Sequence, residues 1–427
     1  MQATEAHRAI EAVWRIESAK IIAGLARMLR DVGLAEEIAQ DALIAALESW
    51  PETGIPDHPG AWLMLTAKRR AIDCIRRNKR LAELGPILAA GEEAATLDVE
   101  ALDDDIGDDL LRLVFTACHP VLSTEARVAL TLRLLAGLTT AEIARAFLVA
   151  EPTIAQRIVR AKRTLTEARV PFEMPRAAER AGRLASVLEV IYLIFNEGYA
   201  ATDGDDWMRP ELCDEALRLG RVLAGLAPEE PEVLGLLALM EIQASRLRAR
   251  IGPDGEPVLL SEQDRSRWDH LLIRRGLAAL DRIEALGGPL GPYALQAAIA
   301  ACHARARTTE DTDWARIVAL YDALVQTSPS PVVELNRAVA VAMAFGPTAG
   351  LELIEALRSD PALRHYHLLP AVRGDLLVRL ARLDEAGREF ERAAALARNA
   401  AERRLLLARA MACTTAADRR RSERGPI

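Results

Sequence analysis

The stretch that decides the fold is GAWLMLTAKRRAIDCIRRNKR, residues 60–80, in which a tryptophan leads into a strongly basic segment. At about 100° per residue, Arg69, Arg70, Asp73, Arg76, Arg77 and Arg80 fall on one arc of a helix, and the apolar side chains fall on the opposite arc. The cationic set, in a protein whose formal net charge is −8, comprises Lys68, Arg69, Arg70, Arg76, Arg77, Lys79 and Arg80, with Asp73 as the only acid among them. The apolar set comprises Met64, Leu65, Ala71, Ile72 and Ile75. One face is expected to pack inside the protein, and the other is either a polyanion-binding surface or a solvated charged face.

Composition predicts an all-α protein with several domains. Hydrophobic residues make up 51% of the chain but aromatic residues only 4%, and alanine and leucine dominate over the β-branched types. This balance favours helices over strands. A length of 427 residues corresponds to roughly two to four domains.

Several classes of protein are disfavoured by the sequence. The five cysteines contain no C-x-x-C pair, and the N-terminus lacks the apolar region of a signal peptide. No segment approaches the roughly 20 apolar residues that cross a bilayer. Cys118 and His119 have no partner cluster that would make them metal ligands. We therefore expect a cytoplasmic protein with no metal, cofactor or membrane contact.

Residues 1–82 are predicted to form three or four helices. Apolar residues from Ile10 to Leu25 recur at helical spacing, and this first helix closes near Gly33. A second helix follows with an exposed acidic side. Prolines and glycines between Trp50 and Trp62 then predict a rigid loop that no helix crosses. Residues 83–109 contain ten acids and no base, which is typical of a disordered, self-repelling linker.

Residues 110–170 are predicted to form four helices that end in a helix-turn-helix. Thr139 and Glu142 form a capping box for the third helix, and Pro152 opens the fourth. The inner face of the fourth helix comprises Ile154, Ile158, Ala161 and Leu165. Its outer face has the character of a recognition helix for the major groove of DNA.

The two patterns together resemble regions 2 and 4 of an extracytoplasmic-function sigma factor of the sigma-70 family. The resemblance rests on GLAEEIAQDALIAALESWP, AWLMLTAKRRAIDCIRRNKR and the helix-turn-helix. It implies binding to the RNA polymerase core enzyme and to promoter DNA, without enzymatic activity. The implied polymerase contacts are Asp31, Glu36, Glu37, Gln40 and Asp41. The implied −10 contacts are Trp62, Lys68, Arg69, Arg70, Asp73, Arg76, Arg77, Lys79 and Arg80. The implied −35 contacts are Thr153, Ala155, Gln156, Arg157, Arg160, Lys162 and Arg163.

Three positions qualify this resemblance. The family usually has asparagine at the position of Arg69, which bears on base recognition by that residue. It usually has lysine and histidine at the positions of Ala155 and Val159, so the chain is expected to read its own −35 sequence. Trp62 is either part of a pocket for an unstacked base or a core tryptophan that starts its helix. The acidic linker is expected to thread the RNA exit channel of the polymerase.

The remaining residues are predicted to form a helical extension at 175–290 and helix pairs resembling tetratricopeptide repeats at 291–427. YLIFNEGYAATDG, GPYALQAAIAACHARA and SPVVELNRAVAVA resemble the C-terminal extension (DUF6596 type) of a subgroup of these sigma factors. Stacked helix pairs form a concave surface that binds a peptide or a protein domain. The resemblance implies that this extension regulates activity.

Two other functions remain open from the residues alone. A free-standing regulator could bind duplex DNA as a dimer through residues 123–168 and use the repeats as a sensor. Alternatively, the extension could be catalytic, because Glu197, Asp203, Asp205 and Asp206 are close in sequence. A solvated turn explains these acids more simply, and the sequence contains no phosphate loop, nucleophile elbow or zinc motif.

Overall fold

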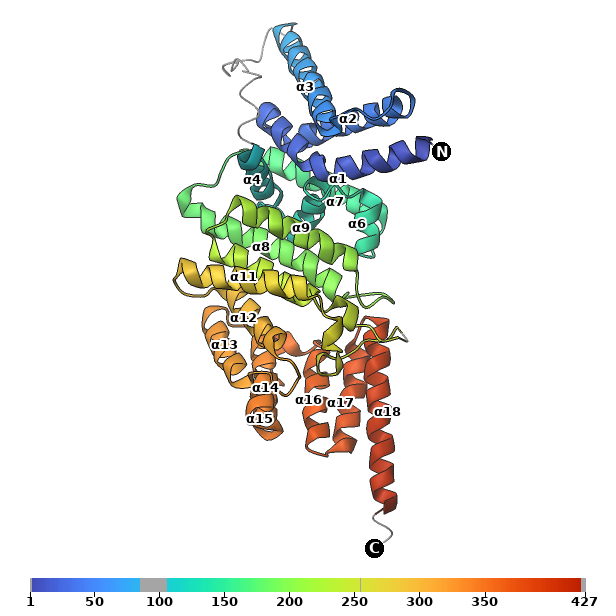
Figure 1. Cartoon of the computed structure of the whole chain (residues 1–427), viewed down its shortest axis with the longest axis vertical. Helices are drawn as coiled ribbons and strands as arrows, with labels where there is room; N and C mark the ends of the chain where they lie inside the picture. The colour runs from blue at the N-terminus through green and yellow to red at the C-terminus, as the bar shows by residue number, and fades with distance from the viewer. Residues whose placement is uncertain (1, 85–105, 254, 424–427) are drawn as a thin grey trace. The chain divides into compact units, whose positions relative to one another are not determined.

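The computed structural model describes residues 2–84, 106–253 and 255–423, with side chains at 6–77, 107–253 and 255–419. Across these ranges every long element is an α-helix, and the only β pairing is an isolated bridge between Ile251 and Pro257. The predicted all-α class is confirmed (Figure 1). The chain divides into two compact units, Met1–Leu193 and Ile194–Ile427.

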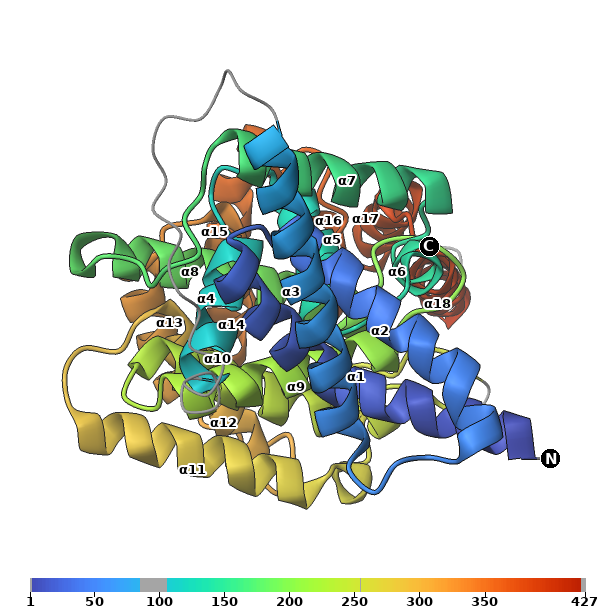
Figure 2. The same ribbon diagram turned by 90° about the horizontal axis from the view of Figure 1, so that it is seen from above.

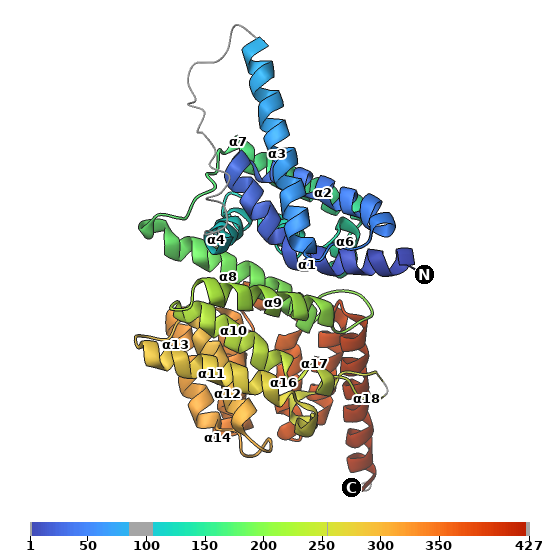
Figure 3. The same ribbon diagram turned by 45° about the horizontal axis from the view of Figure 1, so that its top comes forward.

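The first unit begins with three helices, α1 (Gln2–Leu29), α2 (Val32–Thr53) and α3 (Pro59–Leu84). Arg30 takes a left-handed conformation (φ 53°) that ends α1, and the Asp31 side chain caps α2 by accepting a hydrogen bond from Leu34 N at 3.0 Å. Helix α3 crosses α1 and α2 (Figure 2), and its C-terminal half extends beyond them (Figure 3). Within that half, the side chains of Asp73, Arg76 and Arg77 are exposed.

Two details of this region differ from expectation. The loop between the tryptophans is only residues 54–58, because Pro51 is tolerated in the last turn of α2 and Pro59 starts α3. Leu65 is 49% exposed rather than packed. The buried stripe of α3 is Leu63, Ala67 and Ala71, at a spacing of four residues.

Four helices follow, α4 (Ile106–Ala117), α5 (Thr124–Leu134), α6 (Thr140–Ala146) and α7 (Glu151–Glu167). Their number agrees with the sequence prediction. Ser123 caps α5, and Thr139 and Glu142 form the predicted capping box of α6. The predicted inner face of α7 is buried at all four positions. Helices α6 and α7 are the two helices of the motif, and we call all four, α4–α7, the helix-turn-helix of the first unit.

Helix α8 (Ala177–Tyr199) spans the division between the units. Its early turns are bound to α4 and α5 within the first unit. Arg183 donates to the carbonyl oxygen of Phe115 at 2.7 Å, and Ser186 donates to that of Cys118 at 2.7 Å. Arg127 pairs with Glu189 at 2.9 Å. The start of α8 is thus anchored to the helix-turn-helix.

The second unit is built of helices that succeed one another through short breaks (Figure 1). Its α-helices are α9 (Pro210–Leu226), α10 (Pro231–Ala244), α11 (His270–Leu286), α12 (Pro292–Arg305), α13 (Trp314–Thr327), α14 (Pro331–Phe345), α15 (Pro347–Leu357), α16 (Leu368–Arg379), α17 (Leu383–Leu396) and α18 (Ala400–Glu423). Short 3₁₀ helices lie at Leu247–Ala249, Leu260–Glu262, Arg265–Arg267 and Pro361–Leu363. Consecutive helices from α12 onward pack on each other, as expected for stacked pairs.

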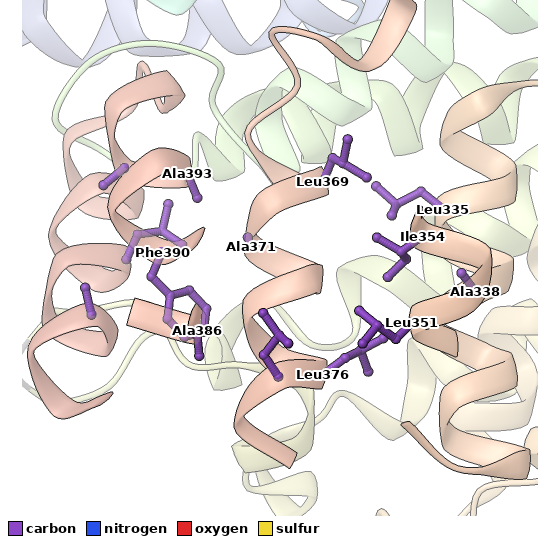
Figure 4. Packing of buried hydrophobic residues seen from close by; sticks show 14 of the residues in the cluster. Leu335, Ala338, Leu351, Ile354, Leu369, Ala371, Leu376, Ala386, Phe390 and Ala393 are labelled. Atoms are coloured by element: carbon purple, nitrogen blue, oxygen red, sulfur yellow. The ribbon is translucent and has the colours of Figure 1, made fainter. Parts of the chain in front are cut away.

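A buried hydrophobic cluster of the second unit lies on both sides of α16. Leu369 and Leu376 of α16 point toward Leu335 and Ile354, and Phe390 of α17 lies on the opposite side of α16 (Figure 4). All five side chains are buried. Helix α16 therefore joins the α14–α15 pair to α17.

The acidic turn after α8 is held by internal hydrogen bonds. Glu197 forms an ion pair with Arg209 and accepts a 2.8 Å hydrogen bond from the Thr202 hydroxyl. The fully buried Asn399 donates to the carbonyl oxygen of Asp206 at 2.8 Å. These bonds favour a structural role for the turn.

Gly235 lies where α10 and α12 approach closely. A Cβ at this position would lie 2.6 Å from the backbone nitrogen of Ala294. Because backbone cannot move aside as a side-chain tip does, Gly235→Ala is expected to destabilise the protein by about 1–3 kcal/mol in urea denaturation. Gly225→Ala in α9 is the control, since nothing lies within 4 Å of its added Cβ. Equal stabilities of the two variants would contradict the close helix contact.

Candidate nucleic-acid interface

The basic surface of α3 is largely exposed. Arg69, Arg76 and Arg77 are exposed, and none of them forms an ion pair with another described residue. Arg70 pairs with Asp41 of α2 at 3.4 Å, and the Asp73 side chain is also exposed. Lys68 is half-buried, and the side chains of Lys79 and Arg80 lie outside the described residues. Three guanidinium groups therefore remain available to an external anion.

Trp62 lies at the start of this surface. Its ring meets the buried ring of Trp50 edge-on, with centroids 5.4 Å apart. Trp62 itself is only partly buried. One part of the ring packs on the helical core, and another part faces solvent beside the basic helix.

Helix α7 presents a second exposed surface. Gln156 and Arg160 are exposed, Arg157 is half-buried, and Val159 is 64% exposed. Thr153, Ala155 and Arg163 are exposed as well. A groove of about 380 Å³ runs between these side chains and the segment Val121–Ser123 that precedes α5. The outer face of α7 thus has the exposure and hydrogen-bonding groups that reading DNA bases requires.

The sequence pattern placed Glu36 on the exposed acidic side of α2. That prediction is wrong, because the structure buries Glu36. It is 3% exposed and accepts a 2.6 Å hydrogen bond from Arg133 Nε of α5. It also forms an ion pair with Lys162 of α7 and accepts a hydrogen bond from Gln40. Burial pushes the pKa of Glu36 upward, but Lys162 and Arg133 together outweigh it, so the pKa lies below its usual value.

The Glu36 cluster joins α2 to the helix-turn-helix. We use the name Glu36 cluster for Glu36, Arg133 and Lys162. Sequence patterns gave Glu36 and Lys162 separate binding roles, but in this conformation each is the partner of the other. Arg15 also pairs with Glu142 at 2.9 Å. Two surfaces to which the sequence patterns gave separate roles are therefore in contact.

The other acidic residues of α2 are placed differently. Glu37 and Asp41 are exposed, whereas the Asp31 carboxylate is used as the helix cap. Asp109, which the sequence assigned to the acidic linker, is buried in the first turn of α4, where it pairs with Arg27 at 3.2 Å. Residues 85–105 of the predicted linker lie outside the described residues.

Comparison with protein-family models matches three parts of the chain. Residues 17–81 match sigma-70 region 2, and residues 112–165 match sigma-70 region 4. Residues 183–284 match a family of unknown function, DUF6596. The first two matches coincide with the basic helix and the helix-turn-helix.

Relatives support the same assignment. An uncharacterized protein of Rhizobium meliloti is 46% identical over 381 residues, which cover 88% of this chain and 89% of the relative. The ECF RNA polymerase sigma factor SigK of Mycobacterium ulcerans is 32% identical over 145 residues, which cover 33% of this chain and 75% of SigK. The chain belongs to the ECF RNA polymerase sigma factors. A probable ECF sigma factor of Mycobacterium tuberculosis, SigI, is 28% identical over 43% of this chain and 68% of its own length.

Membership in the sigma factors confirms the predicted resemblance, including its DUF6596 extension. The sigma regions lie in the first unit, and most of the DUF6596 match lies in the second. No helix within the described ranges has the length and apolar character that a membrane crossing requires.

Proposed function

We propose that this sigma factor directs the RNA polymerase core enzyme to promoters through two separate DNA contacts, with α3 at the −10 element and α7 at the −35 element. The observation that supports this proposal is the presence in one chain of two exposed cationic helix faces, each within a matched sigma region. Phosphates provide most of the affinity of such faces, and base contacts provide specificity.

At the −10 element, Arg69, Arg76 and Arg77 bind phosphates, and Trp62 meets a base that leaves the stack when the duplex melts. Unstacking a base costs a few kcal/mol, which an aromatic contact offsets by about 1–3 kcal/mol. The partial exposure of Trp62 on the same helix, seven residues before Arg69, supports this role. Lys68, Arg70, Asp73, Lys79 and Arg80 complete the proposed −10 set.

At the −35 element, Arg160 and Gln156 read base edges, with Thr153, Ala155, Arg157, Lys162 and Arg163 beside them. Arg160→Ala is expected to relax the preference at one −35 base pair by about 1–3 kcal/mol, because a bidentate contact is lost. Binding of holoenzyme to a set of single-base promoter variants measures this preference. Unchanged selectivity at every position would show that Arg160 does not face the bases.

On the polymerase side, Glu37 and Asp41 form the exposed part of the proposed core-binding surface, which also includes Asp31, Glu36 and Gln40. Co-elution of the full chain with core polymerase tests this surface. Glu37→Lys with Asp41→Lys is expected to weaken co-elution, because like charges across an interface cost several kcal/mol. Glu48→Lys with Glu52→Lys, also exposed on α2, is the matched control. Equal weakening by both pairs would argue against a specific acidic contact.

The Glu36 cluster represents a closed state of the sigma factor in this proposal. Glu36 is unavailable to polymerase while it is bonded to Arg133, and Lys162 is unavailable to DNA phosphates while it is bonded to Glu36. Productive binding requires these pairs to separate, so the closed state lowers the apparent affinity for both partners.

The C-terminal helices regulate this equilibrium in our proposal, and their repeat surface binds a peptide or protein. The bonds from Arg183 and Ser186 to the helix-turn-helix give α8 a direct connection to the −35 domain. Run-off transcription by residues 1–193 and by the full chain tests the regulatory role. Equal transcription by the two would contradict it.

A further inference from the structure

A row of alternating aromatic rings and guanidinium groups lies in the second unit. Each guanidinium carbon is within cation–π range of the adjacent ring centroids. The successive distances are 4.3, 3.6, 5.9, 5.9 and 4.8 Å. In spatial order the row is Trp207, Arg250, Tyr199, Arg246, Trp268 and Arg265. We call it the arginine ladder. Its residues come from the end of α8, the turn after it, the segment after α10, and the segment before α11.

The two central arginines of the ladder are buried without a carboxylate. Arg246 and Arg250 are each 7% exposed, and neither pairs with an acid in the described part of the chain. Arg250 donates to the carbonyl oxygen of Tyr199 at 3.0 Å and to the sulfur of Met208 at 3.2 Å. Arg246 donates to Gln243, while its Nε has no acceptor. Burial, together with the nearby charge of Arg250, lowers the pKa of Arg246.

Another buried arginine of the second unit has carboxylate partners. Arg373 is 9% exposed and donates to Glu355 and Glu389, both at 2.8 Å. Burying an ion without a counter-charge costs more free energy than a desolvated cation–π contact returns. Arg373 is thus neutralised by two carboxylates of the same unit, whereas Arg246 and Arg250 have none among the described residues.

Other groups at the ladder are also donors without acceptors. The indole Nε1 atoms of Trp207 and Trp268 are buried and have no partner among the described residues. Arg265 binds the carbonyl oxygens of His303 and Ala306 at 2.6 and 2.9 Å. Burial and the nearby arginines lower the pKa of His303 to about 4, so its ring adds no positive charge at neutral pH. A ligand that complements these groups would accept hydrogen bonds and carry negative charge.

We propose that the arginine ladder is a binding site for a phosphate-class oxyanion, held chiefly by Arg246. Planar guanidinium groups match the oxygens of such an anion and form strong charge-assisted hydrogen bonds with them. The anion is either free phosphate or the terminal phosphate of a small metabolite. All six ladder residues lie within the segment that matches the family of unknown function. The site would give this segment a chemistry that does not depend on promoter binding.

Thermal melting of the full chain with added inorganic phosphate, at constant ionic strength set by potassium chloride, tests the site. The melting temperature is expected to rise by about 5 °C when phosphate is at 100 times its dissociation constant. Glycerol 3-phosphate in a parallel series identifies the source. Tighter binding than that of inorganic phosphate indicates a metabolite, and equal or weaker binding indicates the free ion.

Two variants separate ligand binding from packing. Arg246→Gln is expected to abolish the phosphate-dependent rise without lowering the melting temperature in phosphate-free buffer, because it removes an unpaired buried charge. Arg373→Gln is expected to melt lower in either buffer, because it removes an ion-pair partner from both Glu355 and Glu389, and to retain the phosphate-dependent rise. Equilibrium dialysis of the unmodified chain should give one phosphate per chain. Absence of both the rise and the bound phosphate, or a full rise in Arg246→Gln, would overturn the proposal.

Discussion

Glu36→Ala is expected to destabilise the contact between α2 and the helix-turn-helix by about 3–5 kcal/mol, because it strands Arg133 and Lys162 without their shared counter-charge. Both cations are largely buried, with side chains 21% and 19% exposed. The free energy of unfolding of the first unit, from urea denaturation of the full chain, measures the effect. Glu37→Ala, at the exposed neighbouring position, should change it by no more than about 0.5 kcal/mol. Equal effects of the two substitutions would mean that the Glu36 cluster is absent in solution.

The same contact has a defined pH dependence. The folded protein lowers the pKa of Glu36 below the ordinary carboxyl value of 4.5. Its stabilising contribution is therefore complete above about pH 4.5 and is lost as the pH falls through the lower, folded-state pKa. Glu36→Ala should remove this part of the acid sensitivity, whereas Glu37→Ala should retain it.

Glu36 has two proposed roles, holding the closed state and contacting polymerase. A substitution of its partner Arg133 distinguishes them. Arg133→Ala breaks the cluster but leaves the acidic surface of α2 intact. Arg133→Ala is expected to increase the fraction of the protein that co-elutes with core polymerase. Glu36→Ala is not expected to increase it. Weaker co-elution of Arg133→Ala would contradict the proposed closed state.

Replacement of Arg69, Arg76 and Arg77 with alanine is expected to have the second large effect. If each arginine binds one phosphate, the salt slope of promoter binding by holoenzyme falls by up to about 2.7. Between 50 and 200 mM salt, the unmodified protein should then lose about 40-fold more affinity than the variant. The loss should be similar for all promoter sequences, because phosphate contacts are not base-specific.

A control of equal charge is available on α17 and in the short segment after it. Arg388, Arg392 and Arg398 are exposed, and their replacement with alanine removes the same three charges from the chain. This control should leave the salt slope unchanged. Equal slopes for the α3 variant and the unmodified protein would show that this face of α3 does not bind DNA.

Local patterns predicted the helices of the first unit well. The capping box of α6 and the buried stripe of α7 depend on residues three and four positions apart, so the sequence contains all the necessary information. The extent of the proline-rich loop and the exposure of Leu65 were wrong in detail. Both depend on how α3 packs against α1 and α2, and helical spacing alone does not define that packing.

Long-range pairs could not be predicted from local patterns. Arg133 is 97 residues from Glu36, and a polar face of α2 looks the same whether it meets solvent or buried cations. Likewise, Arg246 and Arg250 lie in the arginine-rich segment SRLRAR, residues 245–250, whose sequence does not indicate which side chains surround them. Only the fold brings Tyr199, Trp207 and Trp268 beside them.

Run-off transcription with core polymerase and a library of promoter sequences tests the central proposal most directly. The proposal predicts initiation only when the full chain is added, from templates that share one −10 and one −35 sequence. It also predicts that Arg160→Ala changes the selected −35 sequence and leaves the −10 sequence unchanged. Transcription no different from that of core polymerase alone, across the whole library, would contradict the proposed role in promoter recognition.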